Sequence, residues 1–221
     1  MDWHDWHQKY DEPGSHLGRR LAIVQERVRE ALDTAPPGPL RAVSVCAGQG
    51  RDLVEVLATH PRRADVTALL VELDPRNAEF ARRTAAEAGL DGVRVVVGDA
   101  SRTDLYADAV PAQLVLICGV FGNIVDADVR RVVDHCDQLC APGGTLVWTR
   151  HRKDPDLVPS VCAWLEERGF ERVWLAERGG ELGVAGVGVH RFTGTSRPLA
   201  RGERMFTFVG YDTLRRPAAD A

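Results

Sequence analysis

Two glycines one residue apart, Gly48 and Gly50, interrupt the chain between a continuous apolar run and a helical pattern. The apolar run covers residues 40–46, and apolar side chains return within residues 53–57 at the spacing of one helix face. Such an order of strand, glycine turn and helix lets backbone amides approach a ligand closely and directs a helix N-terminus at it. Taken alone, the turn could also be a tight connection with a purely structural role.

Four further apolar runs have the length of buried strands, and they cover residues 66–71, 93–97, 114–117 and 145–148. Helical patterns lie between them, and continuous apolar strands that alternate with helices predict a parallel sheet covered on both faces. Ligands bind such sheets at the carboxyl ends of the strands. We therefore expect the Gly48 turn, Glu72, Asp99 and Cys118, which all follow strands, to meet in one cleft.

Side chains that can cap a helix N-terminus precede several helical patterns. The predicted caps are Ser15, Asp74, Asp126 and Asp154, the second and fourth of them followed by a proline at the first helical position. Beyond Gly169, where the last of these helices should end, residues 171–176 predict a sixth strand.

A dinucleotide-binding site would require a third glycine where this chain has Leu53. Glu72 fits either a dinucleotide or another nucleoside ligand, because its carboxylate can accept from both ribose hydroxyls. Asp99 has no place in the dinucleotide pattern.

Over residues 39–177 the sequence resembles the class I S-adenosylmethionine-dependent methyltransferases. Residues 46–52 resemble the first motif of that family, Glu72 its ribose-binding acid, residues 98–100 its third-strand motif, and residues 142–144 the turn before its fifth strand. The resemblance implies S-adenosylmethionine as cofactor. It also implies a doubly wound α/β fold: a mostly parallel, seven-stranded Rossmann-like sheet with an antiparallel last strand, which is either 187–192 or 205–209.

The resemblance implies cofactor-binding residues at the ends of the first four predicted strands. They are Ala47, Gly48, Gln49, Gly50, Glu72, Leu73, Asp99, Ala100, Ser101, Cys118 and Gly119. The chain departs from the family pattern at two positions. Cys46 stands where the family usually has an acidic residue, and Asp52 stands where it has a third glycine. We expect Asp52 either to cap the following helix or to accept from the ammonium group of the cofactor.

The length of 221 residues, 44% of them hydrophobic, suits one domain: an N-terminal segment 1–38, a cofactor-binding core 39–177 and a C-terminal region 178–221. A net charge of −4 gives no basic field for nucleic acid. No apolar stretch is long enough to span a membrane, and we predict a cytoplasmic protein. Lys9 and Lys153 are the only lysines, which suggests a GC-rich bacterial genome. The five scattered cysteines are expected to be small buried side chains, and no metal site is predicted.

The N-terminal segment is rich in aromatic and histidine residues. Trp3, Trp6 and Tyr10 either anchor the chain end against the core or form, with the helix that Ser15 caps, a lid over the cleft. His4, His7 and Tyr10 are candidate catalytic residues, together with Asn123.

The methyl acceptor is predicted to be a small molecule. After the fourth strand the chain lacks the Asn/Asp-Pro-Pro-Tyr/Phe motif that related enzymes use on adenine or glutamine nitrogens. Phe121 and Asn123 are candidates for an aromatic wall and a polar contact, and Arg150 with His151 for binding an acidic substrate, although each also suits an ordinary loop. A nicotinamide-dependent oxidoreductase and a non-catalytic S-adenosylmethionine-binding protein are the alternatives.

Overall fold

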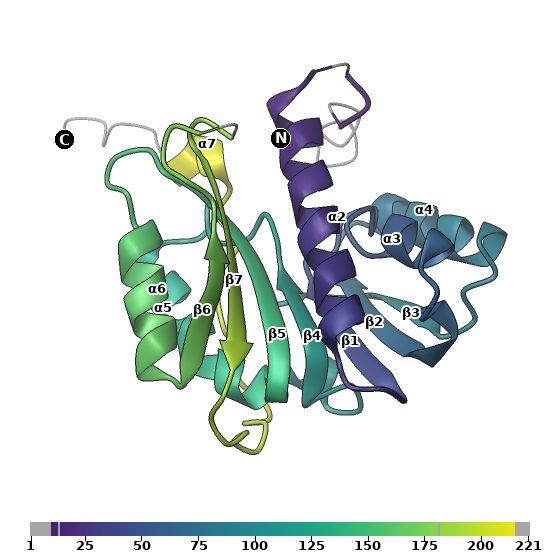
Figure 1. Cartoon of the computed structure of the whole chain (residues 1–221). Helices are drawn as coiled ribbons and strands as arrows, with labels where there is room; N and C mark the ends of the chain where they lie inside the picture. Colours follow the sequence, from purple (N-terminus) through teal and green to yellow (C-terminus); the bar gives the residue numbers. More distant parts are fainter. Residues whose placement is uncertain (1–9, 13, 181, 215–221) are drawn as a thin grey trace.

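The computed structural model describes residues 10–12, 14–180 and 182–214. Its centre is a seven-stranded sheet in the order β3-β2-β1-β4-β5-β7-β6 (Figure 1). The strands are β1 (Leu40–Val45), β2 (Val66–Glu72), β3 (Val93–Val97), β4 (Ala112–Ile117), β5 (Cys140–His151), β6 (Phe170–Leu175) and β7 (Ala185–Phe192). β1 to β5 pair in parallel, and β7 is antiparallel to both β5 and β6. The predicted mixed sheet is confirmed, and residues 187–192 rather than 205–209 supply its antiparallel strand.

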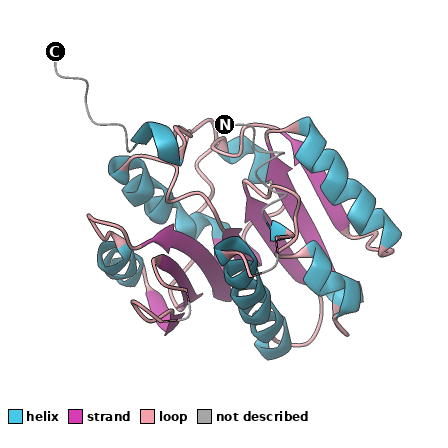
Figure 2. Cartoon of the chain, turned by 90° about the horizontal axis from the view of Figure 1, so that it is seen from above, coloured by secondary structure: helices cyan, strands magenta, loops and turns pink. Residues whose placement is uncertain are grey.

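Helices cover both faces of this sheet (Figure 2). They are α2 (His16–Thr34), α3 (Val54–Thr59), α4 (Pro75–Glu87), α5 (Asp126–Leu139), α6 (Val158–Glu167) and α7 (Tyr211–Leu214), with 3-10 turns η2 (Arg63–Asp65) and η3 (Thr103–Tyr106). Side chains of α2, α3 and α4 share one core cluster with Ala42 of β1, whereas α5 and α6 share the other with Val43. The alternation of Ala42 and Val43 follows from the two-residue period of a strand.

Two predicted helix caps are present, and two predictions were wrong. The Ser15 hydroxyl accepts from the Gly18 amide at 2.9 Å, and Asp74 caps α4. Asp126 lies inside the first turn of α5, where Val125 occupies the N-cap position. Asp154 does not start α6. That helix begins at Val158, whose amide donates to Asp156 at 3.0 Å, because the next residue in the chain is a second proline that fits the first helical turn.

The predicted turn at residues 142–144 is a bulge within β5, not a turn ahead of it. The register of β4 against β5 shifts between Ala112 and Leu114, opposite this bulge. A Cβ atom at Gly144 would lie 2.8 Å from the carbonyl oxygen of Ala141 and 2.9 Å from that of Ala112. The backbones approach so closely there that only glycine fits.

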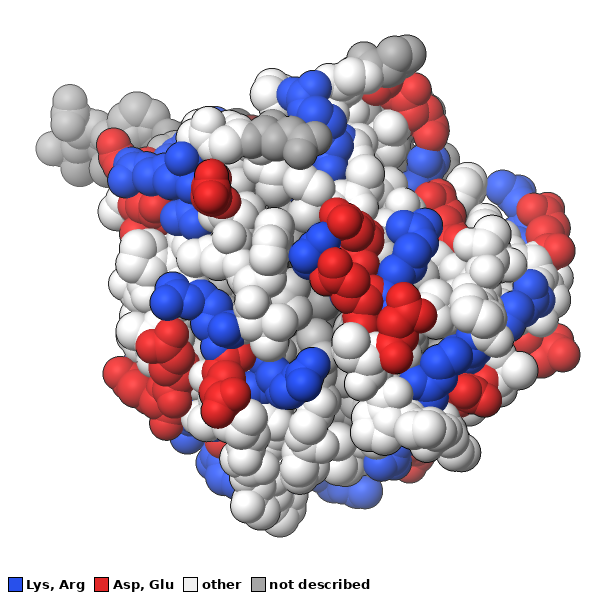
Figure 3. Space-filling model, in the orientation of Figure 1, with Lys and Arg blue, Asp and Glu red and all other residues white. Residues whose placement is uncertain are grey.

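Charged side chains are interspersed on the molecular face that carries α2 (Figure 3). Arginine and carboxylate residues alternate over this face without a broad area of one sign. None of the helices in the described part of the chain is both long and apolar enough to cross a membrane.

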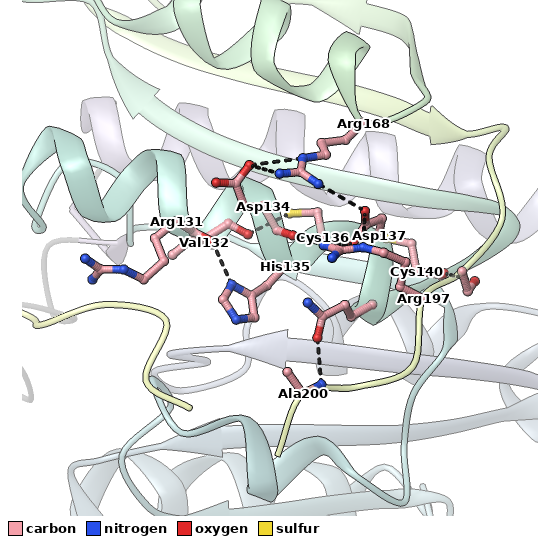
Figure 4. A network of polar contacts seen from close by, with 12 residues as sticks. Arg131, Val132, Asp134, His135, Cys136, Asp137, Cys140, Arg168, Arg197 and Ala200 are labelled. Carbon is pink, nitrogen blue, oxygen red and sulfur yellow. Dashed lines mark hydrogen bonds and ion pairs between the residues drawn. The ribbon is translucent and has the colours of Figure 1, made fainter. Parts of the chain in front are cut away.

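The chain beyond β7 returns along α5 and is fixed there by ion pairs (Figure 4). Arg197 donates to both carboxylate oxygens of Asp137, each at 2.8 Å, and the Ala200 amide donates to Gln138 at 2.8 Å. Asp137 also lies 3.8 Å from Arg168, at the end of α6. These contacts bring residues 202–211 to the edge of the sheet where the parallel strands end.

Candidate cofactor site

A cavity of about 200 Å³ opens where the loops after β1, β2, β3 and β4 meet. Most of the predicted cofactor-binding residues line it: Ala47, Gly48, Gln49, Glu72, Leu73, Asp99, Cys118 and Gly119. Gly50, Ala100 and Ser101 are not among the lining residues. A Cβ at Gly50 would lie 2.8 Å from Leu70, so this glycine allows the turn to pack on the sheet.

The turn after β1 holds a strained residue at the cavity wall. Cys46 has a φ of +53° and is the one non-glycine residue with a positive φ in the described part of the chain. Such backbone conformations persist where the surroundings enforce them, and they cluster at functional sites. Burial raises the pKa of the Cys46 thiol, with Glu72 and Asp99 adding to the effect, so the thiol is neutral.

The Glu72 carboxylate is held by backbone amides on both sides. Its Oε2 accepts from the Gly48 amide and its Oε1 from the Asp74 amide, each at 2.8 Å. Burial raises the pKa of Glu72, while these two amides act in the opposite direction. Each oxygen keeps a further lone pair, so the group can also accept from ligand hydroxyls.

Asp52 does not cap α3, which corrects the first of its two expected roles. Leu53 occupies the N-cap position of α3, and no side chain caps that helix. Asp52 lines the cavity instead, and its Oδ1 atom is buried with no hydrogen-bond partner within the described residues. Burial raises the pKa of Asp52 to about 6, although backbone hydrogen bonds at Asp52 and Leu53 lower it. A buried carboxylate oxygen without a donor is costly unless a ligand supplies one.

Asp99 makes two contacts inside the protein. Its Oδ1 accepts from the Ser101 amide at 3.0 Å and the Ser101 hydroxyl at 2.7 Å, so the carboxylate stabilises the turn after β3. Its Oδ2 lies 3.2 Å from a guanidinium nitrogen of Arg204, and both side chains are about half exposed. The second oxygen therefore remains accessible to a ligand that approaches from the cavity.

The N-terminal part of α2 supplies one wall of the cavity through Arg20, Leu21 and Val24. Arg20 donates to the Tyr10 hydroxyl at 3.2 Å. Burial raises the pKa of Tyr10, so its hydroxyl is neutral. His4 and His7, the other N-terminal candidates, lie outside the described residues, and the lid hypothesis stays a prediction.

Cys118 and Thr149 form the end of the cavity at β4 and β5. The Thr149 hydroxyl accepts from the Gly119 amide at 2.8 Å. Burial raises the pKa of the Cys118 thiol well above its ordinary value, and the nearby Asp52 carboxylate adds to this, so Cys118 is neutral as well. Cys136, Cys140 and Cys162 are buried in the core as predicted, whereas Cys46 and Cys118 lie at this site.

Three of the four predicted substrate-binding residues do not line the cavity. Phe121 is fully buried and packs on Trp148, with ring centroids 5.9 Å apart. Arg150 donates to the Phe121 carbonyl and to Asp126, the latter at 3.0 Å, so its charge is satisfied inside the protein. His151 packs edge-on against Tyr211. For Arg150 the reason is that a strand alternates its side chains, and its neighbour Thr149 is the β5 residue that lines the cavity.

Asn123 does line the cavity, but its side chain is occupied. Its Nδ2 donates to the Gly119 carbonyl at 2.6 Å, and its Oδ1 accepts from the Tyr211 amide at 2.8 Å. Asn123 therefore connects the loop after β4 to the C-terminal segment, and a direct catalytic role would break these bonds.

Sequence reasoning missed Arg20, Phe206 and Phe208, which all line the cavity. Arg20 precedes Val24 by four residues, so an arginine on the apolar face of α2 was the available signal. Phe206 and Phe208 alternate as they would in a strand, but the sequence does not show where that segment lies. In the described residues, no three His, Cys, Asp or Glu side chains are grouped closely enough to bind a metal ion.

Residues 42–144, which run from β1 to the bulge in β5, match a family model described as a methyltransferase domain. The strand order and the strand-end cavity agree with this match. Residues 42–144 therefore form a methyltransferase domain of the class I S-adenosylmethionine-dependent type. S-adenosylmethionine is accordingly its cofactor. No curated protein sequence matches this methyltransferase closely enough to be called a relative.

Many solved structures share the fold of this methyltransferase. The carbon methyltransferase of CurJ superimposes with a TM-score of 0.65 at 16% identity, covering 82% of this chain and 56% of that one. The N-methyltransferase NodS from Bradyrhizobium japonicum gives 0.60 at 14% identity, covering 83% and 99%. An O-methyltransferase family protein from Burkholderia thailandensis gives 0.61 at 18% identity, covering 84% and 57%. At these identities the likeness shows the fold alone, and the three names differ in the atom methylated.

The residues at the cavity suit the cofactor of this methyltransferase family. The cofactor carries an ammonium group, and Asp52 offers a buried carboxylate oxygen that lacks a donor. It also carries two ribose hydroxyls, and Glu72 offers two fixed acceptor atoms at the end of β2.

Proposed function

We propose that this chain transfers the methyl group of S-adenosylmethionine to a small-molecule acceptor and that the strand-end cavity binds the cofactor. The observation that carries the proposal is the Glu72 carboxylate. It is buried, it is fixed by the Gly48 and Asp74 amides, and it lies beside the glycine turn in a cavity of about 200 Å³. Burying a charged group costs free energy, and two neutral acceptors would serve the Gly48 and Asp74 amides, so the charge of Glu72 favours a contact with a ligand.

Glu72 would accept hydrogen bonds from the ribose hydroxyls. Leu73 and Asp99, which line the cavity on the side of β3, would contact the adenine ring, with the accessible Oδ2 of Asp99 facing its amino group. Backbone groups of residues 47–49 would contact the part of the nucleoside that Glu72, Leu73 and Asp99 do not reach, since the glycine turn lets the backbone approach a ligand closely.

The methionine end would lie between Asp52 and Arg20. The buried Oδ1 of Asp52 suits the ammonium group, and the Arg20 guanidinium suits the carboxylate because it presents several donors in one plane. Tyr10 accepts from Arg20 and would hold it in place. Opposite charges on either side of a zwitterion fix its orientation.

The cofactor supplies an electrophilic methyl group, and the protein has to place the acceptor in line with it and exclude water. Cys118, Gly119 and Thr149 would surround that position at the ends of β4 and β5. The Cys118 thiol is neutral, so neither thiolate chemistry nor a cysteine base is proposed. Positioning and dehydration would then provide most of the rate enhancement.

A small acceptor is favoured by the walls of the cavity. Tyr10, side chains of α2, Phe206 and Phe208 all line a cavity of about 200 Å³, a volume that suits a small molecule rather than a folded chain. The mixed charges in Figure 3 give a nucleic acid no basic area on that face. The absence of nucleic-acid and membrane partners, a cytoplasmic location and a bacterial source stay predictions.

The two alternatives differ from the proposal in measurable ways. A nicotinamide-dependent enzyme is disfavoured by Leu53, which is fully buried where the third glycine should be. A non-catalytic cofactor-binding protein would bind the cofactor without consuming it.

Calorimetric titration of the full chain with S-adenosylhomocysteine and, separately, with NAD tests the proposal first. Binding of S-adenosylhomocysteine and no binding of NAD is the expected result, and the reverse would refute it. Mass spectrometry of a panel of small acceptors incubated with S-adenosylmethionine then separates a methyltransferase from a protein that only binds the cofactor.

A further inference from the structure

Residues 202–211, here called the C-terminal strap, cross the strand-end edge of the sheet without forming a strand of it. An isolated bridge between Arg102 and Arg204 is the strap's only strand-like pairing among the described residues. Its amides are nevertheless bonded along its length. Met205 donates to the Ser101 carbonyl at 2.8 Å and Thr207 to Asp128 at 2.7 Å.

The far end of the strap is fixed by Asn123. The Asn123 carbonyl accepts from the Val209 and Gly210 amides, each at 2.9 Å, and its side chain accepts from the Tyr211 amide at 2.8 Å. Irregular segments with this many bonded amides are fixed parts of a structure, because each lost bond to a buried group is costly. The strap is therefore a rigid wall of the cavity.

The strap turns two aromatic rings toward the cavity. Phe206 and Phe208 both line it, whereas Thr207 between them is exposed. This is the alternation expected of an extended chain. Phe206 is 1% exposed and Phe208 is 37% exposed, so the first ring forms the inner wall and the second lies at the mouth. Leu21 and Val24 of α2 also line the cavity.

Near the strap, most polar side chains that line the cavity already have hydrogen-bond partners in the protein or are assigned to the cofactor. Both ends of the Asn123 amide are bonded within the protein, and Arg20 and Asp52 are assigned to the cofactor. Thr149 accepts from the Gly119 amide, and its own hydroxyl hydrogen is not used in that bond. An acceptor with a net charge would lose its hydration here without gaining a partner, which is unfavourable.

We propose that the C-terminal strap is the acceptor-recognition wall and that the acceptor is an uncharged, aromatic small molecule held between Phe206, Phe208 and the α2 side chains. One polar atom of the acceptor would take the hydrogen bond that Thr149 can donate. Offset or edge-on ring contacts with the two phenylalanines would orient the acceptor for transfer. The inference rests on the proposed function, because it takes the remaining space to belong to the cofactor.

Two fluorescent probes with the same aromatic ring system, one uncharged and one anionic, test whether the acceptor site prefers an uncharged molecule and whether the strap binds it. N-phenyl-1-naphthylamine is uncharged, and 8-anilinonaphthalene-1-sulfonate is the same ring system with a sulfonate. Each is titrated into the full chain saturated with S-adenosylhomocysteine. The uncharged probe should bind roughly 10-fold more tightly or better. Tighter binding of the sulfonate would overturn the uncharged class of acceptor.

Phe208→Ala and Thr207→Ala are the matched variants, because Phe208 lines the cavity whereas its neighbour Thr207 is exposed and does not. Phe208→Ala should weaken the uncharged probe roughly 10-fold, while Thr207→Ala should not, and both should bind S-adenosylhomocysteine like the parent chain. Equal probe binding by both variants would overturn the strap as the wall. Failure of the parent chain to bind S-adenosylhomocysteine would instead refute the proposed function, and the inference with it. Melting curves confirm that both variants fold.

Discussion

Replacement of Asp52 by asparagine is predicted to stabilise the ligand-free protein and to weaken cofactor binding. Burial raises the pKa of Asp52 from 3.8 to about 6. A difference of about two units is worth roughly 3 kcal/mol at most, since one unit is about 1.4 kcal/mol. Partial exposure of the residue lowers this value through solvent screening.

The sign follows from proton linkage. Below about pH 4 both the folded and the unfolded chain hold the Asp52 proton, and the carboxyl costs nothing extra. Between pH 4 and 6 the unfolded chain releases the proton first, so stability falls as the pH rises through this window. Above about pH 6 the whole penalty is present. Asp52→Asn has the same shape and no charge, so it should remove the penalty at pH 8 and change nothing at pH 4.

The assay is a thermal melt of the ligand-free chain at pH 4 and pH 8, followed by titration with S-adenosylhomocysteine at pH 8. At about 2–4 °C per kcal/mol for a chain of this size, the melting temperature at pH 8 should rise by several degrees. Loss of a charged acceptor for the ammonium group should weaken binding roughly 10- to 150-fold. Asp91→Asn, at an exposed position, serves as the control.

Two results would refute this reasoning. An equal change in melting temperature at pH 4 and pH 8 would show that ionisation of Asp52 is not the cause. Unchanged affinity would show that Asp52 does not contact the ligand. In the parent chain, affinity should also fall as the pH drops below about 6, and in Asp52→Asn this dependence should disappear.

Three further predictions concern the same cavity. Glu72→Gln should weaken S-adenosylhomocysteine roughly 10-fold or more and lower the melting temperature, because its amide nitrogen would face the Gly48 or the Asp74 amide, which is also a donor; calorimetry showing equal affinity would remove Glu72 from the site. Arg20→Ala should weaken S-adenosylhomocysteine, by titration, but not 5′-methylthioadenosine, which lacks the amino acid group; equal losses for both ligands would contradict a contact with the carboxylate. Asp99→Ala should lower the melting temperature, because Ser101 loses its acceptor, and should also weaken 5′-methylthioadenosine. A lower melting temperature with unchanged affinity would leave Asp99 with a structural role alone.

The sequence was sufficient for the inner strands β1, β2 and β4 because they are buried on both faces. Their apolar runs are continuous, and the caps at Ser15 and Asp74 depend on residues only two or three positions away. The start of α6 was missed because residues 154–159 contain two aspartates, each followed within three positions by a proline. Either aspartate could precede a helix, and the local sequence does not decide between them. The bulge at Gly144 was missed because it depends on the distance to the neighbouring strand β4.

The cofactor side of the cavity was predictable for a related reason. The predicted residues that line it follow strand ends, and the topology of a parallel sheet brings strand ends together. Arg150 shows the limit of that argument. It lies near the end of β5, but its side chain points away from the cavity toward Asp126. The strap was beyond prediction because its contacts join residues far apart in the chain, such as Asn123 and Tyr211, 88 positions apart.

The residues proposed to bind the nucleoside lie inside the segment that matches the family model, and those proposed to bind the acceptor lie outside it. The residues proposed to bind the nucleoside, from Ala47 to Asp99, lie inside residues 42–144. Phe206 and Phe208 of the proposed acceptor wall lie outside that range, as do Thr149 and the α2 residues that line the cavity. The matched segment therefore carries the chemistry that methyltransferases share. In the proposed arrangement the acceptor specificity of this chain would come from α2 and the C-terminal strap. The carbon, nitrogen and oxygen methyltransferases that superimpose on this chain share its fold alone and do not indicate its acceptor.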